Sequence, residues 1–233
     1  VFTLLKVTIY IFGGEFILSN DVTGGLIWVA AATILIASMV AMTQDNLKAR
    51  LAYSTVSQLS YIVLGAMLAS KAGLIGASMH IAMHAFAKIT LFFGAGAIMV
   101  ASHKKKVSEL NGLGRAMPVT FVAFLIGTLS IIGLPPFGGM WSKWYLGLGA
   151  VETSQLLLLA VLMISSLLII MYLLPIPIRA FFSTPDSGEH YTKIAEAPKL
   201  MLLAMVITST ACVILFFYPD PFYRLAGLAA GGN

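Results

Sequence analysis

Long apolar runs separated by short polar stretches make up most of the chain. Runs of about 18 or more apolar residues recur along the sequence, and that length is needed to cross a bilayer as a helix. Segments of about ten residues with alternating polarity, which a transmembrane barrel requires, do not occur. The pattern therefore predicts an all-α fold, a polytopic transmembrane bundle of about seven helices.

Polar residues, glycines and prolines give the expected boundaries of these helices. We expect them over residues 1–18, 24–43, 53–70, 73–101, 118–149, 155–182 and 199–218, with residues 137–149 as the second half of the fifth, broken helix. The helix that begins at Pro118 should break at Leu134-Pro135-Pro136, because proline lacks the backbone donor and clashes with the preceding turn. A bend is expected near Pro175 and Pro177. Residues 1–219 then form one transmembrane domain, and residues 220–233 a polar, flexible tail.

Composition agrees with a membrane protein. The 233 residues are 59% hydrophobic and 10% charged, whereas soluble domains carry about 25% charged residues. The net charge of +5 does not indicate nucleic acid, because the basic residues lie at helix ends and in short loops. The single cysteine, Cys212, excludes a disulfide within this sequence and argues against a thiol-based metal site. We expect neither a metal nor a cofactor.

The basic residues divide unequally between the two sides of the predicted bundle. The opposite side holds only Lys71 and Arg224, so the loops with more positive charge should be cytoplasmic. The run Lys104–Lys106 is explained by topology, with binding of anionic lipid as the alternative. The nine residues on the basic side are Lys48, Arg50, Lys104, Lys105, Lys106, Arg115, Arg179, Lys193 and Lys199.

One apolar segment carries three ionisable side chains at helical spacing. His80, His84 and Lys88 are four residues apart, so they form a stripe roughly 12 Å long on one helix face. Ionisable groups inside a membrane helix are expensive, and they usually mark an ion or proton pathway. The alternative is that such residues only bond a neighbouring helix.

Three lysines, Lys6, Lys88 and Lys143, fall within membrane segments. Each costs about 2.5–3.5 kcal/mol at a helix centre, or on the order of 8–10 kcal/mol together, unless it is paired or hydrated. Lys143 follows the proline break, and broken helices at membrane depth line wet cavities and ion sites. Its alternative interpretation is a lysine that extends to the interface beside Trp141 and Trp144. A Lys–His–His–Lys series is a chemically sensible proton relay, because histidine titrates near neutrality and has two ring nitrogens.

Three motifs in order along the chain carry a family resemblance. They are the string 44–61 (QDNLKARLAYSTVSQLSY), His80-x-x-x-His84-x-x-x-Lys88, and the string 133–143 (GLPPFGGMWSK). The chain resembles the proton-conducting antiporter-like proteins, which include the large membrane-arm subunits of respiratory complex I and the A-type and D-type components of the Mrp sodium/proton antiporter. The resemblance extends over nearly the whole sequence. Because the chain opens on Val1 within apolar sequence, we expect it to be the C-terminal portion of a longer subunit.

The resemblance implies a role for each ionisable residue. Lys6 matches the lysine of the first broken helix and Lys48 a lysine in an Asp-Leu-Lys motif. His80, His84 and Lys88 match a central hydrophilic axis, and Lys143 the ionisable group of the second broken helix, which leads to an aqueous face. Asn46 stands where aspartate is common and Ala49-Arg50 replaces the usual Arg-Leu order, so an ion pair at that corner is not implied.

Three functional hypotheses follow. The first is a proton-translocating subunit of a multisubunit sodium/proton antiporter, similar to the D-type component of the Mrp antiporter, in a bacterial inner membrane, with other membrane subunits, lipid, protons and Na⁺ as partners. The second is a proton-pumping subunit of an NADH:quinone oxidoreductase or a related hydrogenase complex. The third is a membrane scaffold without proton conduction. Since the sequence has no nicotinamide, flavin or iron–sulfur motif, the chain is not a redox catalyst by itself.

Overall fold

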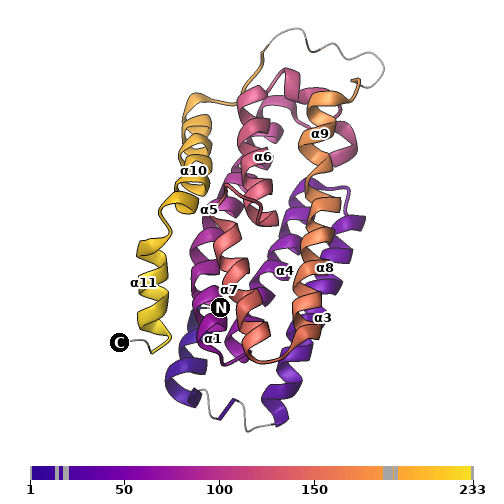
Figure 1. Ribbon diagram of the computed structural model, residues 1–233. Coiled ribbons are helices and arrows are strands. Elements are labelled where there is room, and N and C mark those ends of the chain that lie inside the picture. The colour runs from indigo at the N-terminus through magenta and orange to yellow at the C-terminus, as the bar shows by residue number, and fades with distance from the viewer. Residues whose placement is uncertain (1, 14–15, 18–20, 186–190, 192–193, 232–233) are drawn as a thin grey trace.

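The computed structural model describes residues 2–13, 16–17, 21–185, 191 and 194–231. These residues form a bundle of helices (Figure 1), and the part of the chain described contains no strand beyond one isolated bridge between Asn46 and Lys106. The predicted all-α polytopic fold is confirmed.

The first half of the bundle contains α1 (Phe2–Lys6), which continues as the π-helix η1 (Val7–Phe12), then α3 (Asp21–Thr43), α4 (Leu47–Met67) and α5 (Lys71–Ser102). Two short 3₁₀ helices, η2 (Val107–Glu109) and η3 (Leu113–Arg115), lie in the following connection. The second half contains α6 (Pro118–Ile132), α7 (Gly139–Glu152), α8 (Leu156–Leu173), α9 (Pro175–Phe182), α10 (Lys199–Phe217) and α11 (Asp220–Ala229).

Several helices are long and apolar enough to cross a membrane. They are Gly24–Thr43, Lys71–Ser102, the continuous segment Leu156–Phe182, and Lys199–Phe217. Helix α4 has a comparable length of 21 residues but is more polar, and its serines, Gln58 and Tyr61 are buried between neighbouring helices. The protein is therefore a multi-pass membrane protein in which one polar helix lies inside the bundle.

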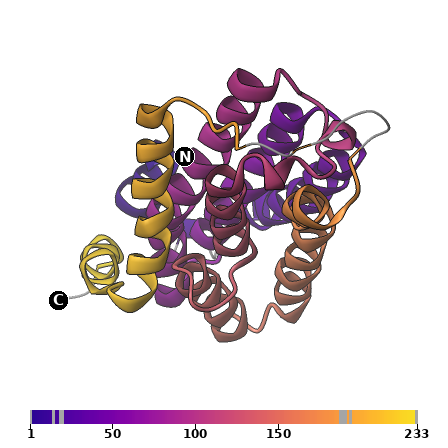
Figure 2. The ribbon, with the colours of Figure 1, turned by 90° about the horizontal axis from the view of Figure 1, so that it is seen from above.

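Helix α5 lies at the centre of the bundle. It contacts α4, α6, α7, α10 and α11, while α3 and α8 lie beyond α4 and α7 (Figures 1 and 2). Glycine allows its close approach to α7, because a Cβ added at Gly76 would come within 2.6 Å of the Leu146 nitrogen and 2.9 Å of the Tyr145 carbonyl carbon. At the same interface, a Cβ at Gly149 would meet Gly73 at 2.6 Å. The backbones of α5 and α7 therefore lie in direct contact at these glycines.

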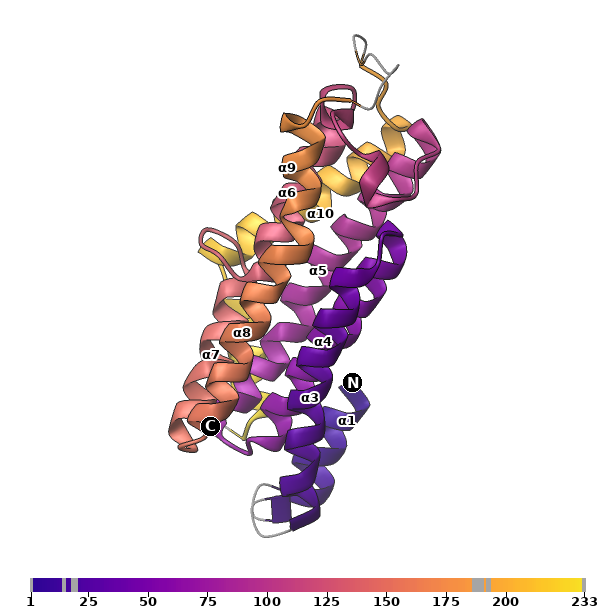
Figure 3. The ribbon, with the colours of Figure 1, turned by 90° about the vertical axis from the view of Figure 1, so that its right-hand side faces the viewer.

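The two predicted irregularities are confirmed. Helix α6 ends at Ile132, Gly133 adopts a left-handed conformation with φ of 89°, and α7 begins only at Gly139. The peptide bond between Pro135 and Pro136 is cis. Helix α8 ends at Leu173 and α9 begins at Pro175, which agrees with the expected bend. Figure 3 shows the bundle from the side, with α6 and α7 on either side of the first irregular region and α8 and α9 on either side of the second.

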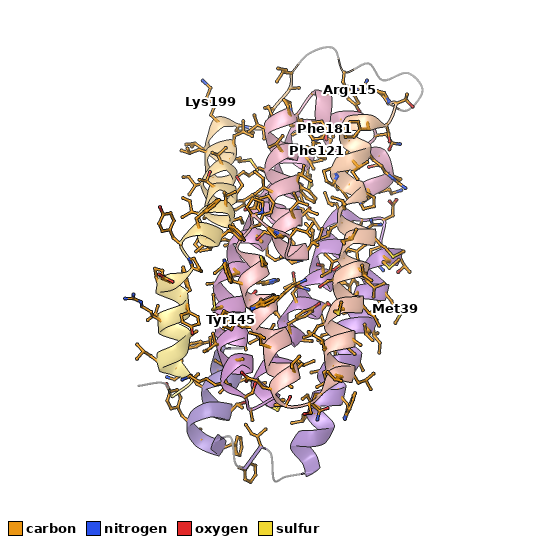
Figure 4. The ribbon with its side chains drawn as sticks, in the orientation of Figure 1. Met39, Arg115, Phe121, Tyr145, Phe181 and Lys199 are labelled. Carbon is orange, nitrogen blue, oxygen red and sulfur yellow. The ribbon has the colours of Figure 1, made fainter. Side chains whose placement is uncertain are left out.

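The three connections expected on one side of the membrane lie together at one end. The Leu47 nitrogen donates to the Lys105 carbonyl at 2.9 Å, and the Gly112 nitrogen donates to the Arg179 carbonyl at 3.2 Å. Figure 4 places Arg115 and Lys199 at this same end, next to the edge-to-face pair Phe121 and Phe181. The sorting of basic residues by loop therefore agrees with the arrangement of the helices for the residues described, and Lys193 lies outside them.

The carboxylate of Asp45 joins two of these connections by hydrogen bonds. Asp45 accepts hydrogen bonds from the Ser108 nitrogen at 3.0 Å and the Ser108 hydroxyl at 2.8 Å. Slight burial acts to raise the pKa of Asp45, but the Ser108 bonds and the charges of Lys106 and Arg50 outweigh it and lower that pKa. Asp45 is therefore held as a carboxylate at neutral pH, and it links the α3–α4 turn to the loop after α5.

Helix α4 begins at Leu47, six residues before the predicted start at residue 53. The Asn46 side chain caps it by accepting from the Ala49 nitrogen at 3.1 Å. Leu47 and Leu51 are buried in the core, Lys48 is exposed, and the half-buried Arg50 donates to the Tyr172 carbonyl on α8 at 3.1 Å. The stretch expected to be a polar connection is therefore the first turn and a half of an amphipathic helix.

The predicted flexible tail also requires correction, because residues 220–229 form α11. Pro221 and Asp220 lie in the first turn, where proline and acidic residues favour helix starts. Ala226 is buried against Met79 of α5, and the ring of Tyr223 lies 5.3 Å from that of Tyr145. The helix start signals were present in the sequence, but the packing partner on α5 was not visible.

We predict that Gly76→Ala lowers the apparent melting temperature of the detergent-solubilised protein. The added methyl group would collide with the α7 backbone, and such overpacking costs about 1–3 kcal/mol. The matched control is Gly96→Ala on the same helix, where the added Cβ would meet only Met201 at an ordinary 3.6 Å. Equal melting temperatures for the two variants would contradict this role of the α5–α7 interface.

Candidate functional site

The ionisable stripe on α5 is buried inside the bundle. His80, His84 and Lys88 are only 3%, 7% and 5% exposed. They follow one another along the face of α5 that meets α4, because Lys88 contacts Ser54 and His80 stacks on Tyr61. The predicted stripe therefore runs through the protein interior.

Lys88 is held by uncharged oxygen atoms. Its Nζ donates to the Ser54 hydroxyl at 2.7 Å and to the Leu51 carbonyl at 3.1 Å. Both acceptors are on α4, and neither is a carboxylate. A buried ammonium group without an acidic partner loses hydration that two neutral hydrogen bonds only partly replace. Lys88 is thus held by two hydrogen bonds from α4 and by no ion pair among the described residues.

The two histidines form a stacked pair with one fixed nitrogen. The His80 ring lies 5.6 Å from the His84 ring and 5.6 Å from the Tyr61 ring. His80 Nδ1 lies 2.9 Å from the Ser142 hydroxyl, which donates its own hydrogen to the Gly139 carbonyl at 3.0 Å. The Ser142 oxygen therefore accepts from His80 Nδ1, and the neutral ring is left with a bare Nε2.

Two ring nitrogens on this path are buried without a hydrogen-bond partner. They are His80 Nε2 and His84 Nδ1. Both polar atoms of the Gln58 side chain on α4 are in the same situation. The α4–α5 contacts pair residue 54 with 88 and 61 with 80, and this antiparallel register places Gln58 level with His84. Several polar atoms therefore surround one part of the path and can bind water there.

Lys143 occupies the other end of the buried path. Its Nζ donates to the Ile132 carbonyl at 3.0 Å and to the Ser166 hydroxyl at 3.0 Å, and it lies 5.2 Å from the centre of the Tyr61 ring. The Ile132 carbonyl is free to accept because α6 ends there. A Cβ at Gly133 would come within 2.8 Å of the Lys143 Cδ, so glycine at the break also leaves room for the lysine.

A groove opens beside Lys143 on the outer surface of the bundle. It has a volume of about 610 Å³ and lies mainly between α7, α8 and the α6–α7 break. Its lining is almost entirely apolar, with Lys143, Tyr61 and Ser166 as the polar residues. Lys143 is thus the point where the interior path comes nearest to this surface.

Lys6 and Lys48 lie apart from this core. Lys48 is exposed at the end of the bundle that carries the basic loops, and its Nζ lies 3.6 Å from the Met99 sulfur. Lys6 is exposed where α1 passes into the π-helix η1, an irregular point in the backbone. The structure thus brings together four of the six predicted site residues, and the other two lie outside the path.

The uncharged residues of the site were not predicted from the sequence. The α4 residues Ser54, Gln58 and Tyr61 face the stripe at helical spacing, and this spacing in an otherwise apolar setting was a usable signal. Ser142 and Ser166 gave no such signal, because each is a single serine on a different helix. Only the packing of α7 and α8 brings them to the path.

Fold and site together define a multi-pass helical membrane protein with a buried path of basic residues. The chain belongs to the family described as NADH:quinone oxidoreductase/Mrp antiporter, TM, which it matches over residues 1–169. This confirms the resemblance drawn from the three motifs.

Individual relatives agree with this membership. The chain is 45% identical over 145 residues to NADH-quinone oxidoreductase subunit N of Desulforudis audaxviator, covering 62% of this chain and 29% of that protein. Its fold is similar to a chain of respiratory complex I from Thermus thermophilus, with a TM-score of 0.83, 20% identity, and coverage of 98% and 48%. It is also similar to a chain of the Mrp complex from Dietzia sp. DQ12-45-1b, with a TM-score of 0.81, 24% identity, and coverage of 90% and 47%. The chain therefore spans less than half the length of each of these relatives.

We predict that Lys88→Met makes the protein more stable. The change recovers the cost of about 2.5–3.5 kcal/mol for a lysine at a helix centre and loses two hydrogen bonds worth about 1 kcal/mol each. The apparent melting temperature in detergent should therefore rise, and Lys71→Met, at an exposed helix start, should leave it unchanged. A lower melting temperature for Lys88→Met would mean that Lys88 is a structural residue.

Proposed function

We propose that this chain forms part of a proton-translocating membrane subunit, and that its protons move along Lys88, His84, His80 and Lys143. The observation that carries the proposal is a series of four basic groups inside the bundle, three of them buried and Lys143 partly buried, with no carboxylate in contact with either lysine among the described residues. Membership of the family supports the same conclusion.

The geometry supports a relay that holds few protons at a time. Charged groups in an apolar core repel one another strongly, so a proton on one member disfavours a second on its neighbour. A proton leaving Lys88 would pass to His84 through water bound at the unpartnered nitrogen and the Gln58 amide. His80 Nε2 would accept it next, and Lys143 would receive it beside the groove.

The tautomer of His80 determines which of its nitrogens takes part in the relay. Because Ser142 keeps a hydrogen on Nδ1, an incoming proton can bind only at Nε2. The resulting imidazolium ring lies against Tyr61, and the Nζ of Lys143, which must be neutral to receive the proton, lies 5.2 Å from the centre of the same ring. His80 thus lies between the histidine pair and the terminal lysine.

Lys6 and Lys48 take more peripheral roles in this proposal. Lys6 would serve the half-channel implied by the family, at the irregular junction of α1 and η1. Lys48 would act at the end with the basic loops, which we infer to be cytoplasmic from the positive-inside rule. A bacterial inner membrane is the proposed location.

We predict that Lys88→Ala and Lys143→Ala each reduce proton flux by about a hundredfold in vesicles that contain the full-length subunit in its assembled complex. Each change removes a relay group that no other ionisable residue replaces. Lys71→Ala, at the opposite end from the basic loops, should retain normal flux. If flux were unchanged in both variants of the path while the complex assembled, the subunit would be a scaffold without proton conduction.

Two kinds of complex are candidates for the assembly that contains the subunit. We propose a multisubunit sodium/proton antiporter of Mrp type, in which the proton path is coupled to Na⁺ export by partner subunits. The Ser-Lys-Trp-Tyr string at residues 142–145, after the double proline, supports it, and the fold similarity to the Mrp complex is compatible with it. The 45% identity to a subunit N favours the second candidate, a proton-pumping subunit of an NADH:quinone oxidoreductase or related complex.

Purification of the native complex through a tag on this subunit distinguishes the two. For the antiporter, we expect an imposed proton gradient to drive Na⁺ movement in vesicles, with no iron–sulfur signals in the electron paramagnetic resonance spectrum. Iron–sulfur signals and quinone-dependent proton pumping would instead establish the respiratory complex.

A further inference from the structure

A small pocket lies where the start of α4 meets the end of α5 and the loop that follows α5. It has a volume of about 220 Å³, and no acidic residue is among the described residues that line it. Its lining includes Asn46, Lys48, Ala95, Met99, Lys104 and Lys105. This α4–α5 pocket thus combines an apolar wall from α5 with basic side chains from α4 and the loop.

Hydrogen bonds join the backbone on the two sides of the α4–α5 pocket. The Leu47 nitrogen donates to the Lys105 carbonyl at 2.9 Å, and the Val107 nitrogen donates to the Asp45 carbonyl at 2.7 Å. Lys48 and Lys105, which are far apart in sequence, therefore converge on one pocket. Membrane topology depends only on how many basic residues each side carries, whereas a binding site requires that they converge.

Two of the three lysines at the pocket have no anionic partner in the part of the chain that the structure describes. The Lys48 Nζ lies 3.6 Å from the Met99 sulfur, which is only a weak acceptor. The exposed Lys105 side chain forms neither a hydrogen bond nor an ion pair with the described residues. Lys104 differs, because its Nζ donates to the Tyr191 hydroxyl at 2.6 Å. An anion in the pocket would therefore be bound by Lys48 and Lys105.

The carboxylates of the two adjoining connections are engaged in other bonds. Asp45 accepts from Ser108, and the Glu109 carboxylate accepts from the backbone nitrogens of Lys105 and Lys106 at 3.2 and 3.1 Å. Neither carboxylate lines the pocket. The two lysine ammonium groups thus border a space to which these acidic residues bring no negative charge.

Asn46 adds an uncharged hydrogen-bond donor to the pocket. Its side-chain oxygen accepts from the Ala49 nitrogen at 3.1 Å, so its NH₂ group remains available to donate. Aspartate, which the family resemblance makes common at this position, would cap the helix equally well but would bring a negative charge to the pocket. The asparagine of this chain therefore makes the pocket better suited to an anion.

An exposed apolar surface continues from the pocket toward the middle of the bundle. On α4, Ala52 and Val56 follow Lys48 at spacings of four, and Val56 is 46% exposed. On α5, Phe92 is 37% exposed and lies about 10 Å farther from the basic end than Met99. A ligand that fits this surface has a small anionic group at one end and an apolar tail that lies along the two helices.

We propose that the α4–α5 pocket binds the phosphate group of an anionic phospholipid. The phosphate lies between Lys48 and Lys105, with the Asn46 amide as a further donor, and an acyl chain lies over Val56 and Phe92. Basic pockets between membrane helices are suited to anionic lipid headgroups for these reasons of charge and position. The inference goes beyond the proposed function and does not depend on it, because no proton is transferred in it.

Photocrosslinking of lipid to the native complex tests the proposal. The complex is purified through a tag on this subunit and placed in phosphatidylcholine nanodiscs with a small fraction of phosphatidylglycerol that carries a photoreactive acyl chain. Mass spectrometry then measures the label on each peptide relative to label elsewhere in the same complex. We expect label on residues 52–56 and 92–99. Excess unlabelled phosphatidylglycerol should remove this label, and excess phosphatidylcholine should not.

Two variants change the charge of the pocket without disturbing the fold. Asn46→Asp keeps the helix cap and adds a negative charge, and Lys105→Ala removes one exposed ammonium group. Each should lower the label about fivefold, which corresponds to about 1 kcal/mol for one basic group near an anionic surface. The matched control is Lys106→Ala, which removes the same charge from the adjacent residue outside the pocket and should leave the label unchanged.

Several results would overturn the lipid site. Equal label from a phosphatidylcholine probe, or equal loss of label in Lys105→Ala and Lys106→Ala, would mean that the lysines act only through general surface charge. Displacement by inorganic phosphate alone would indicate a phosphate site without a lipid. Absence of label on this surface would mean that a partner subunit covers it. None of these results bears on the proton relay, which is tested separately by the flux of Lys88→Ala.

Discussion

The rest of this structure depends on two lysines, one buried and one partly buried, that contact no carboxylate in the described part of the chain. Lys88 and Lys143 are each held by one backbone carbonyl and one serine hydroxyl. An ion pair would fix the charge in place, because removing a proton would strand the partner carboxylate. Neutral oxygen atoms tolerate both the charged and the uncharged lysine. The arrangement therefore keeps both protonation states accessible, and this is the property that a proton relay needs.

Irregular backbone supplies part of this support. The end of α6 at Ile132 frees the carbonyl that Lys143 uses, and Gly133 leaves space for the lysine stem. In a regular helix the backbone carbonyls accept hydrogen bonds from the helix itself. If α6 continued without a break, the Ile132 carbonyl would already have such a partner and would be less able to accept from Lys143. The close contact of α5 and α7 through Gly76 then fixes the distance between the histidine stripe and the break. The break and the glycine contact thus act together to position the path.

The polar helix α4 links these features. It is capped by Asn46 at the end that carries the basic loops, and its inward face presents Ser54, Gln58 and Tyr61 to α5. Buried polar groups are costly when unsatisfied, yet the Gln58 amide completes no hydrogen bond within the protein. The unpartnered Gln58 amide lies level with the unpartnered Nδ1 of His84 across the α4–α5 interface. On its other side α4 contacts α3, so the serines of both helices extend the polar region toward α8.

The helical membrane class, the stripe on α5, the break after Ile132 and the shared end of the basic loops could all be predicted from the amino-acid sequence. Each of these depends on local periodicity, on proline and glycine chemistry, or on charge counted along the chain. Three other facts became visible only in the folded chain: Tyr61 separates His80 from Lys143, Ser166 contacts Lys143, and α11 covers α5. These facts depend on how one helix lies against another. That register is set by side-chain packing between segments far apart in sequence, and no local pattern encodes it.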